Sequence, residues 1–469
     1  MNLIGKGLLA ALICLYASSH AHSQRMRIVQ AGSAIADVRE GNVLRKGGWG
    51  MDASVRPDVF EAFIEGPAKR IAFITDRDSV VLNVEPGKTY PFVFLLNGKD
   101  SAFTEVRGIK WVQRAQFPTD YQRAHRGKTT VEVPPMYELL NVVFALTEKG
   151  REKNSLINRD TDYYREVMTR FEPYRNDPAV KKMQEALMSG DGSYSALKMD
   201  AYAFELSQDG TIARSRVYDR IGNSNTNFLH PYIADLQKFA VASRFQEFYH
   251  THKPFYEGLT QAYRDSIGVS QMQRWLVKNF PSTRYDSFKI IFSPLVAGNQ
   301  SASFFEHNGF REAQAHVNFP FHTPQNVAGW SPEALRVKDG NIVFTELNHA
   351  FIGPEGQKPA YRDRIQKALS NLDIWNDPQK PAHGYNTPQM SFDEYMNWAL
   401  VSLRYIDYAP LAEQPKLIAQ IEDIMLNHRG FRRFPEFNQF LVKTYKNRRK
   451  RETVADLYPA IVGWFEENK

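Results

Sequence analysis

The pattern of apolar and polar positions divides this chain into a strand-rich first part and a helix-rich remainder. Between about residue 27 and residue 108, short β-branched and aromatic runs such as RIAFIT, SVVLNVE and YPFVFLLNG are separated by polar turns. Runs of this length and spacing predict the strands of a small antiparallel sandwich. The turn EPGK supports the prediction, because Pro86 presets its own φ and Gly87 accepts a positive φ.

Helical spacing begins after the connector AHRGKTTVEVPP, residues 124–135. In the following PMYELLNVVFALTEKG, apolar side chains recur at helical spacing from Leu139 to Leu146, and Gly150 is expected to end the helix. Long helical patterns then continue to the C-terminus. Strands are expected to interrupt them over residues 193–218, where Asp209-Gly210 predicts a hairpin turn, and over residues 288–298.

These patterns predict an α+β fold with two domains. A small N-terminal β-sandwich domain is expected over residues 24–125, and a mainly helical domain with a small sheet over residues 131–469. We find no internal repeat in the sequence and no low-complexity tract.

The N-terminus has the pattern of a secretory signal peptide over residues 1–23. Lys6 precedes an apolar run from Leu8 to Ala17, which is too short to span a bilayer and ends in small residues that predict cleavage before Gln24. We therefore expect an exported protein, periplasmic or secreted, with no integral membrane span after cleavage. The only cysteine of the chain, Cys14, would leave with the signal, so any metal site has to use His and carboxylate ligands.

The formal net charge of +7 is spread along the chain and names no partner. The one dense basic run, KNRRKRE at residues 446–452, lacks the interleaved aromatic residues on which nucleic-acid bases stack. We interpret it as a solvated helix face, and an exported protein is not expected to bind nucleic acid.

The candidate chemistry lies in NIVFTELNHAFIGP, residues 341–354. Phe344, Leu347 and Phe351 fall on one side of a helix that is expected to stop at Gly353-Pro354. Glu346 and His349 are three residues apart and therefore project from neighbouring positions of that helix. The pair could be a site, or a buried polar pair that holds the helix against its neighbours.

The stretch Thr345-Glu346-Leu347-Asn348-His349 differs at one position from the zinc-binding His-Glu-x-x-His motif. Thr345 stands where the first histidine ligand belongs, and a threonine hydroxyl is a poor zinc ligand at neutral pH. Either Glu346 becomes a ligand itself, as in Glu-x-x-His carboxylate sites, or a histidine from elsewhere fills the gap. The candidates for that histidine are His316 and His322.

Glu394 in SFDEYMNWALVSL is the natural further ligand, since it lies on the next strong helical pattern after a long loop. The alternative is specific: Ser391-x-x-Glu394 is also a capping box, in which Glu394 would bond the backbone at the start of its own helix. Tyr405 and Tyr408 on the same pattern could stabilise an oxyanion or be ordinary core tyrosines. These alternatives are left open by the residues alone.

The segment TELNHAFIGP resembles the motif of a bacterial family of exported proteins called domain of unknown function 4932, whose members are similar to zincin-type peptidases. The segments PPMYELLNVVFAL, FQEFYHTHKPFY, FSPLVAGNQ and FDEYMNWAL are similar to it too, so the likeness covers roughly residues 131–408. The resemblance implies a zincin-like domain in which Glu346 is the general base, His349 is a zinc ligand and Glu394 is the downstream ligand. Thr345 departs from the family pattern.

Two functional hypotheses follow from the residues and the resemblance. In the first, the protein is an exported metallopeptidase-like hydrolase of peptide or protein substrates, with zinc held by His349 and carboxylates and water activated by Glu346. In the second, it is a non-catalytic relative that keeps the cleft and binds peptides or glycans.

Overall fold

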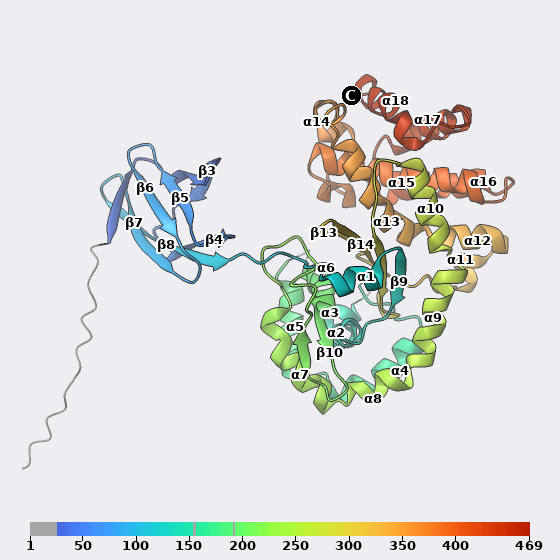
Figure 1. Ribbon diagram of the computed structural model, residues 1–469, viewed down its shortest axis with the longest axis horizontal. Coiled ribbons are helices and arrows are strands. Elements are labelled where there is room, and N and C mark those ends of the chain that lie inside the picture. Colours follow the sequence, from blue (N-terminus) through green and yellow to red (C-terminus); the bar gives the residue numbers. More distant parts are fainter. Residues whose placement is uncertain (1–25, 153–155, 191–192) are drawn as a thin grey trace, which may run out of the picture. The chain divides into compact units, whose positions relative to one another are not determined.

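The computed structural model describes residues 26–152, 156–190 and 193–469 and contains two compact units, Met1–Val112 and Gln113–Lys469 (Figure 1). The signal peptide predicted over residues 1–23 lies outside the described residues. The β-rich first unit and the mainly helical second unit confirm the predicted α+β fold class.

The first unit is a β-sandwich of two four-stranded sheets with strand orders β1-β7-β8-β4 and β3-β2-β5-β6. Its strands are β1 (Arg27–Ala31), β2 (Ile35–Glu40), β3 (Val43–Gly50), β4 (Asp58–Ile64), β5 (Lys69–Ile74), β6 (Ser79–Val84), β7 (Thr89–Leu96) and β8 (Asp100–Lys110). Both sheets contribute to one core, in which Phe73 of β5 and Phe92 of β7 meet with ring centroids 5.4 Å apart. The three predicted strand runs correspond to β5, β6 and β7, and Gly87 has the expected positive φ of 77°.

The sandwich is mixed and not purely antiparallel as expected. Strand β1 pairs with β7 in parallel, and β4 pairs with β8 in parallel. Between the two strands of each parallel pair, the chain forms strands of the other sheet. It can therefore re-enter the first sheet in the same direction.

The boundary between the units falls at Val112, earlier than the domain boundary expected at residue 125. Helix α1 (Thr119–His125) belongs to the second unit, because Phe117 and Tyr121 pack on Phe310 and Tyr218 there. The connector expected at residues 124–135 contains strand β9 and therefore lies inside the second unit.

The second unit is built around a four-stranded sheet of order β13-β14-β12-β9 (Figure 1). Strands β9 (Lys128–Glu132), β12 (Ser287–Phe292) and β14 (Phe310–Val317) run parallel, and β13 (Ser301–His307) is an antiparallel edge strand. Every residue of β12 is buried, as expected for a central strand covered on both faces. The predicted strand at residues 288–298 is therefore confirmed in its first half.

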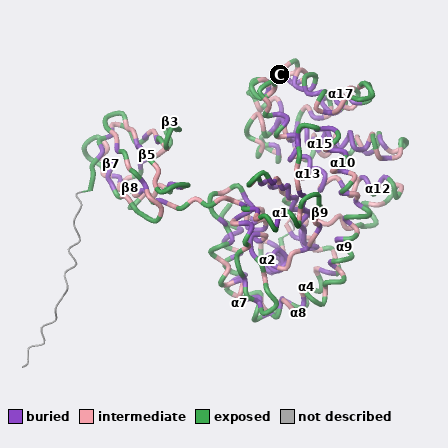
Figure 2. Tube along the Cα trace, viewed as in Figure 1, coloured by how far each residue is buried: buried purple, intermediate pink, exposed green. Residues whose placement is uncertain are grey.

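Helices fill the rest of the second unit, and burial is most complete along α2, α13 and α15 (Figure 2). The longer helices are α2 (Pro135–Leu146), α4 (Asp162–Phe171), α5 (Pro178–Met188), α6 (Ser193–Asp200), α7 (Ile233–Ala242), α9 (Lys253–Asp265), α10 (Val269–Asn279), α12 (Pro332–Asp339), α13 (Asn341–Gly356), α15 (Pro388–Tyr408), α16 (Gln414–Asp423), α17 (Phe434–Asn447) and α18 (Val454–Glu467). Shorter helical pieces are α3 (Glu148–Arg151), α8 (Phe245–Thr251), α11 (Pro324–Val327), α14 (Arg362–Ala368) and the π-helix η6 (Ile424–Arg429).

The prediction of strands from residue 193 onward is wrong in its first part. The segment from Ser193 is not a strand but helix α6, because Tyr194, Leu197 and Lys198 are buried at helical spacing. Only the short hairpin β10 (Phe204–Leu206) and β11 (Ile212–Arg214) remains of the expected strands, with Gly210 at a φ of 86° in its turn.

Gly150 does not end helix α2, which stops at Leu146 with Thr147 as the following cap. A Cβ at Gly150 would lie 2.0 Å from the carbonyl oxygen of Phe144. The glycine is therefore required by a close backbone approach and not by a left-handed cap.

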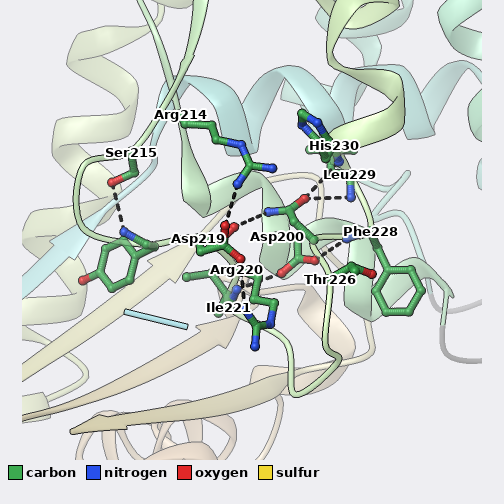
Figure 3. Close-up of polar contacts among 12 residues, drawn as sticks. Asp200, Arg214, Ser215, Asp219, Arg220, Ile221, Thr226, Phe228, Leu229 and His230 are labelled. Atoms are coloured by element: carbon green, nitrogen blue, oxygen red, sulfur yellow. Dashed lines mark hydrogen bonds and ion pairs between the residues drawn. The ribbon is translucent and has the colours of Figure 1, made fainter. Parts of the chain in front are cut away.

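The C-terminal residue of α6 organises the loop that follows β11 (Figure 3). The carboxylate of Asp200 accepts backbone N–H bonds from Ile221 at 2.8 Å, Gly222 at 3.0 Å and Phe228 at 2.7 Å. In the same view, Asp219 accepts one hydrogen bond from the guanidinium of Arg214, at 2.6 Å. These bonds give the loop a defined shape without regular secondary structure.

Candidate functional site

Helices α13 and α15 pack on each other and carry the residues singled out by the sequence. Helix α13 also contacts β13, β14 and α10. Phe344, Leu347 and Phe351 are fully buried on one side of α13, as their spacing predicted. Glu346 and His349 are only partly buried, so the polar pair lies at the border of the core.

Helix α13 runs to Gly356 and does not stop at Gly353-Pro354 as expected. A proline inside a helix leaves the carbonyl four residues earlier without its N–H partner. Here that carbonyl belongs to Ala350, and it accepts a hydrogen bond of 3.2 Å from the hydroxyl of Tyr285. The tyrosine replaces the missing donor, which makes the extra turn possible.

The capping-box interpretation of Glu394 is wrong. Helix α15 begins at Pro388 with Thr387 as its cap, whose hydroxyl accepts from the backbone N–H of Met390. Ser391 instead donates its hydroxyl to the side chain of Asn376 at 2.9 Å. Glu394 therefore lies inside the helix, and its carboxylate is free to face α13.

The structure brings His349 and Glu394 together. Their side chains approach to 3.7 Å between Nε2 of His349 and Oε2 of Glu394. Asn397, one turn after Glu394, donates one N–H to Nε2 of His349 at 2.9 Å and one to Oε2 of Glu394 at 3.2 Å. Trp398 donates its indole N–H to the other carboxylate oxygen of Glu394 at 2.9 Å.

Arg429, the last residue of η6, completes this cluster. Its guanidinium forms an ion pair of 2.6 Å with Oε1 of Glu394, whose side chain is only 3% exposed. It also lies over the rings of Tyr385 and Trp398, at 5.5 Å and 5.2 Å from their centroids. The positive charge next to Glu394 is thus held in place by an ion pair and by two aromatic faces.

The environment shifts the pKa values of the three predicted residues in different directions. Burial, together with the nearby carboxylate of Glu394, raises the pKa of Glu346 to about 8. Burial lowers the pKa of His349 and outweighs the opposing effect of Glu394. Burial alone would raise the pKa of Glu394, but Arg429 and His349, with the N–H donors of Asn397 and Trp398, bring it below the ordinary value.

Within the described residues, neither His316 nor His322 joins Glu346, His349 and Glu394 in a group of ligands arranged to hold a metal ion. His322 lies in an exposed loop and bonds to Asp339 at 2.7 Å. His316 is fully buried in β14, where its Nε2 contacts the side chain of Gln314 at 3.2 Å. Burial, with a smaller contribution from the charge of Lys198, lowers the pKa of His316 to about 3. Thr345 itself donates its hydroxyl to the carbonyl of Ile342 at 2.8 Å.

The two tyrosines considered for an oxyanion role lie toward the far end of α15. Tyr405 is buried and accepts a hydrogen bond from the side chain of Asn341 at the start of α13. Tyr408 packs at the edge of the hydrophobic core. Within the described residues, neither tyrosine forms a hydrogen bond with Glu346, His349 or Glu394.

The donor set does not fit a zinc ion. Nε2 of His349 already accepts from Asn397, and Glu394 is neutralised by Arg429, so two of the three predicted ligands, His349 and Glu394 but not Glu346, have these internal partners. A zinc ligand histidine needs its ring nitrogen lone pair for the metal, and a guanidinium beside the carboxylate repels a second cation. Among the residues that the structure describes, no group of three or more His, Cys, Asp or Glu side chains is arranged to hold a metal ion.

Comparison with known proteins adds no functional assignment. The chain matches no family model, no curated protein and no solved structure. The resemblance of TELNHAFIGP to a peptidase motif therefore remains an expectation that rests on the residues themselves.

Sequence reasoning missed the residues that decide the character of the cluster. Asn397 and Trp398 could have been found, because they stand three and four positions after Glu394 on the same helix and so share its face. Arg429 could not, because it is distant in sequence and reaches Glu394 through η6, which contacts α16 and α17, the two helices that pack on α15.

Within the described residues, no helix combines the length and apolar character needed to cross a membrane.

Proposed function

We propose that this protein is a non-catalytic, metallopeptidase-like peptide-binding protein that acts after export and uses no zinc ion. The single observation that carries the proposal is the ion pair between Arg429 and Glu394 inside the cluster. In this proposal the guanidinium provides the fixed positive charge that a metal ion would provide in a hydrolase. The signal-like residues 1–23 support the location outside the cytoplasm.

The arrangement around α13 supports a peptide as the ligand. Strand β13 forms the edge of its sheet, where it pairs with β14 alone among the described strands, and it packs against α13. An extended peptide can add to such an edge through main-chain hydrogen bonds. The imidazole of His349, with 29% of its side chain exposed, would then contact the peptide from the neighbouring helix.

Metal content of the purified chain tests the absence of a zinc role. After dialysis against zinc and removal of excess, we expect well below one zinc per chain in the wild type, and no change in His349→Ala. One zinc per wild-type chain that is lost in His349→Ala, together with peptidase activity lost in Glu346→Gln, would overturn the proposal in favour of the hydrolase.

Fluorescein-labelled casein tests binding and cleavage with one probe. We expect its fluorescence anisotropy to rise with added protein, with no release of small labelled peptides. His349→Ala is expected to weaken binding, whereas His322→Ala, an exposed histidine bonded to Asp339, is the matched control and should bind as the wild type does. Equal binding by all three proteins would place the peptide elsewhere.

A further inference from the structure

A groove of about 710 Å³ lies along one face of helix α10, between this helix, the end of α9 and the edge strand β9. Its lining contains three cationic side chains, Arg264, Arg274 and Lys278, and one carboxylate, Asp265. The groove is separate from the cluster around Glu394 and shares none of its residues.

Within the described residues, none of the three cations of the groove has a carboxylate as an ion-pair partner. Arg264 donates to neutral oxygens, the carbonyl of Val131 at 3.2 Å and the side chain of Gln261 at 3.5 Å. Arg274 and Lys278 make no ion pair within the described part of the chain. Three cations against one carboxylate give the groove a net positive charge.

One further polar side chain in the lining, Gln273, has an unpaired donor. Gln273 uses its carbonyl oxygen to accept from the hydroxyl of Thr129 at 2.8 Å, which leaves its amide nitrogen buried and without a partner among the described residues. Helix α10 starts after Gly268, which has no side chain to cap the first amides. The first N–H groups of a helix lack acceptors within the helix and carry a partial positive charge, so this end favours an anion.

From this combination we infer that the groove binds a ligand with at least two phosphate groups. Arg274 and Lys278 are one turn apart on α10, so their Cα atoms are separated by about 6 Å along the helix axis. Each can pair with a separate anionic group. A tetrahedral phosphate offers several acceptor oxygens to donors that converge from different directions, and arginine pairs with phosphate through two parallel hydrogen bonds.

Binding of tripolyphosphate to the full chain tests this inference, with tricarballylate, a flexible tricarboxylate, as the comparison at constant ionic strength. Isothermal titration calorimetry is expected to give saturable binding of tripolyphosphate at least about tenfold tighter than that of tricarballylate. Arg274→Gln and Lys278→Gln should each weaken tripolyphosphate binding about tenfold, since each removes one charge-assisted contact.

Two further variants separate a specific site from general attraction of an anion to a basic protein. Lys450→Gln removes one charge from the basic run at residues 446–452 and should leave the affinity unchanged. Ser270→Asp places a carboxylate in the first turn of α10, where it stabilises a helix, so the variant is expected to keep its melting temperature and to lose binding. Equal weakening by Lys450→Gln and Lys278→Gln, or full affinity in Ser270→Asp, would overturn the inference.

Discussion

The ion pair between Arg429 and Glu394 makes a quantitative prediction about stability. Replacing Arg429 by Met keeps an unbranched apolar stem against Tyr385 and Trp398 but leaves Glu394 without its cation. Removing one partner of a buried ion pair costs about 3–5 kcal/mol, since the remaining charge stays in a poorly solvated place. Glu394 is 3% exposed and keeps two N–H donors, so we expect a loss near the lower figure, about 3 kcal/mol.

The double variant Arg429→Met with Glu394→Gln should recover most of this loss, because the amide carries no charge that needs a partner. Urea unfolding of the wild type, both single variants and the double variant closes a double-mutant cycle, for which we expect a coupling of about 2 kcal/mol. Additive effects, within about 0.5 kcal/mol, would refute the reasoning.

Arg364 provides a matched control for burial. It pairs with Glu466 at the same N–O distance of 2.6 Å, but the two side chains are 40% and 34% exposed. Because exposed ion pairs contribute about 0–1 kcal/mol, Arg364→Met should cost under about 1 kcal/mol in the same assay. A loss as large as that of Arg429→Met would mean that burial does not set the strength of the pair.

Two further predictions concern the core of the second unit. Burial raises the pKa of Glu138 from 4.5 to about 7. The folded state therefore keeps a proton on this group that the unfolded state loses, so Glu138 alone should lower the stability by about 3 kcal/mol as the pH rises from 4.5 to 7. Urea unfolding should show the change in stability between these pH values to be about 3 kcal/mol less unfavourable in Glu138→Gln than in the wild type, and unaltered in the exposed control Glu185→Gln. A constant difference between Glu138→Gln and the wild type at both pH values would contradict the assignment. Gly150→Ala places a Cβ 2.0 Å from the carbonyl of Phe144 and should cost about 1–3 kcal/mol. Its melting temperature should be lower than that of Gly258→Ala, because the Cβ of that control meets no described atom within 4 Å. Equal melting temperatures would show that the backbone at Gly150 can shift at little cost.

Local patterns in the sequence predicted most of the regular structure. Short β-branched runs with turn residues between them specify β5, β6 and β7, because side chains of that kind suit a pleated sheet wherever the strands pair. Helical spacing in turn specifies α13 and places Glu346 and His349 on neighbouring positions. These properties depend on residues a few positions apart, so the sequence alone determines them.

Other features were decided by tertiary contacts between distant residues. Pro354 lies inside α13 because Tyr285 supplies the hydrogen bond that the helix loses, and no neighbour of Pro354 in sequence indicates this. The segment from Ser193 is helical because one face of it is buried against the core. Local propensity is weaker than such burial, which explains why both predictions failed.

The candidate site also depends partly on local sequence and partly on tertiary contacts. The sequence by itself placed a Glu and a His on one helix and a second Glu on another. Only the tertiary structure brought Arg429 to 2.6 Å from Glu394 and Asn397 to His349, which gave two of the three predicted ligands internal partners. The charge of a site depends on every group that packing brings within a few ångströms, and those groups come from segments that no local pattern connects.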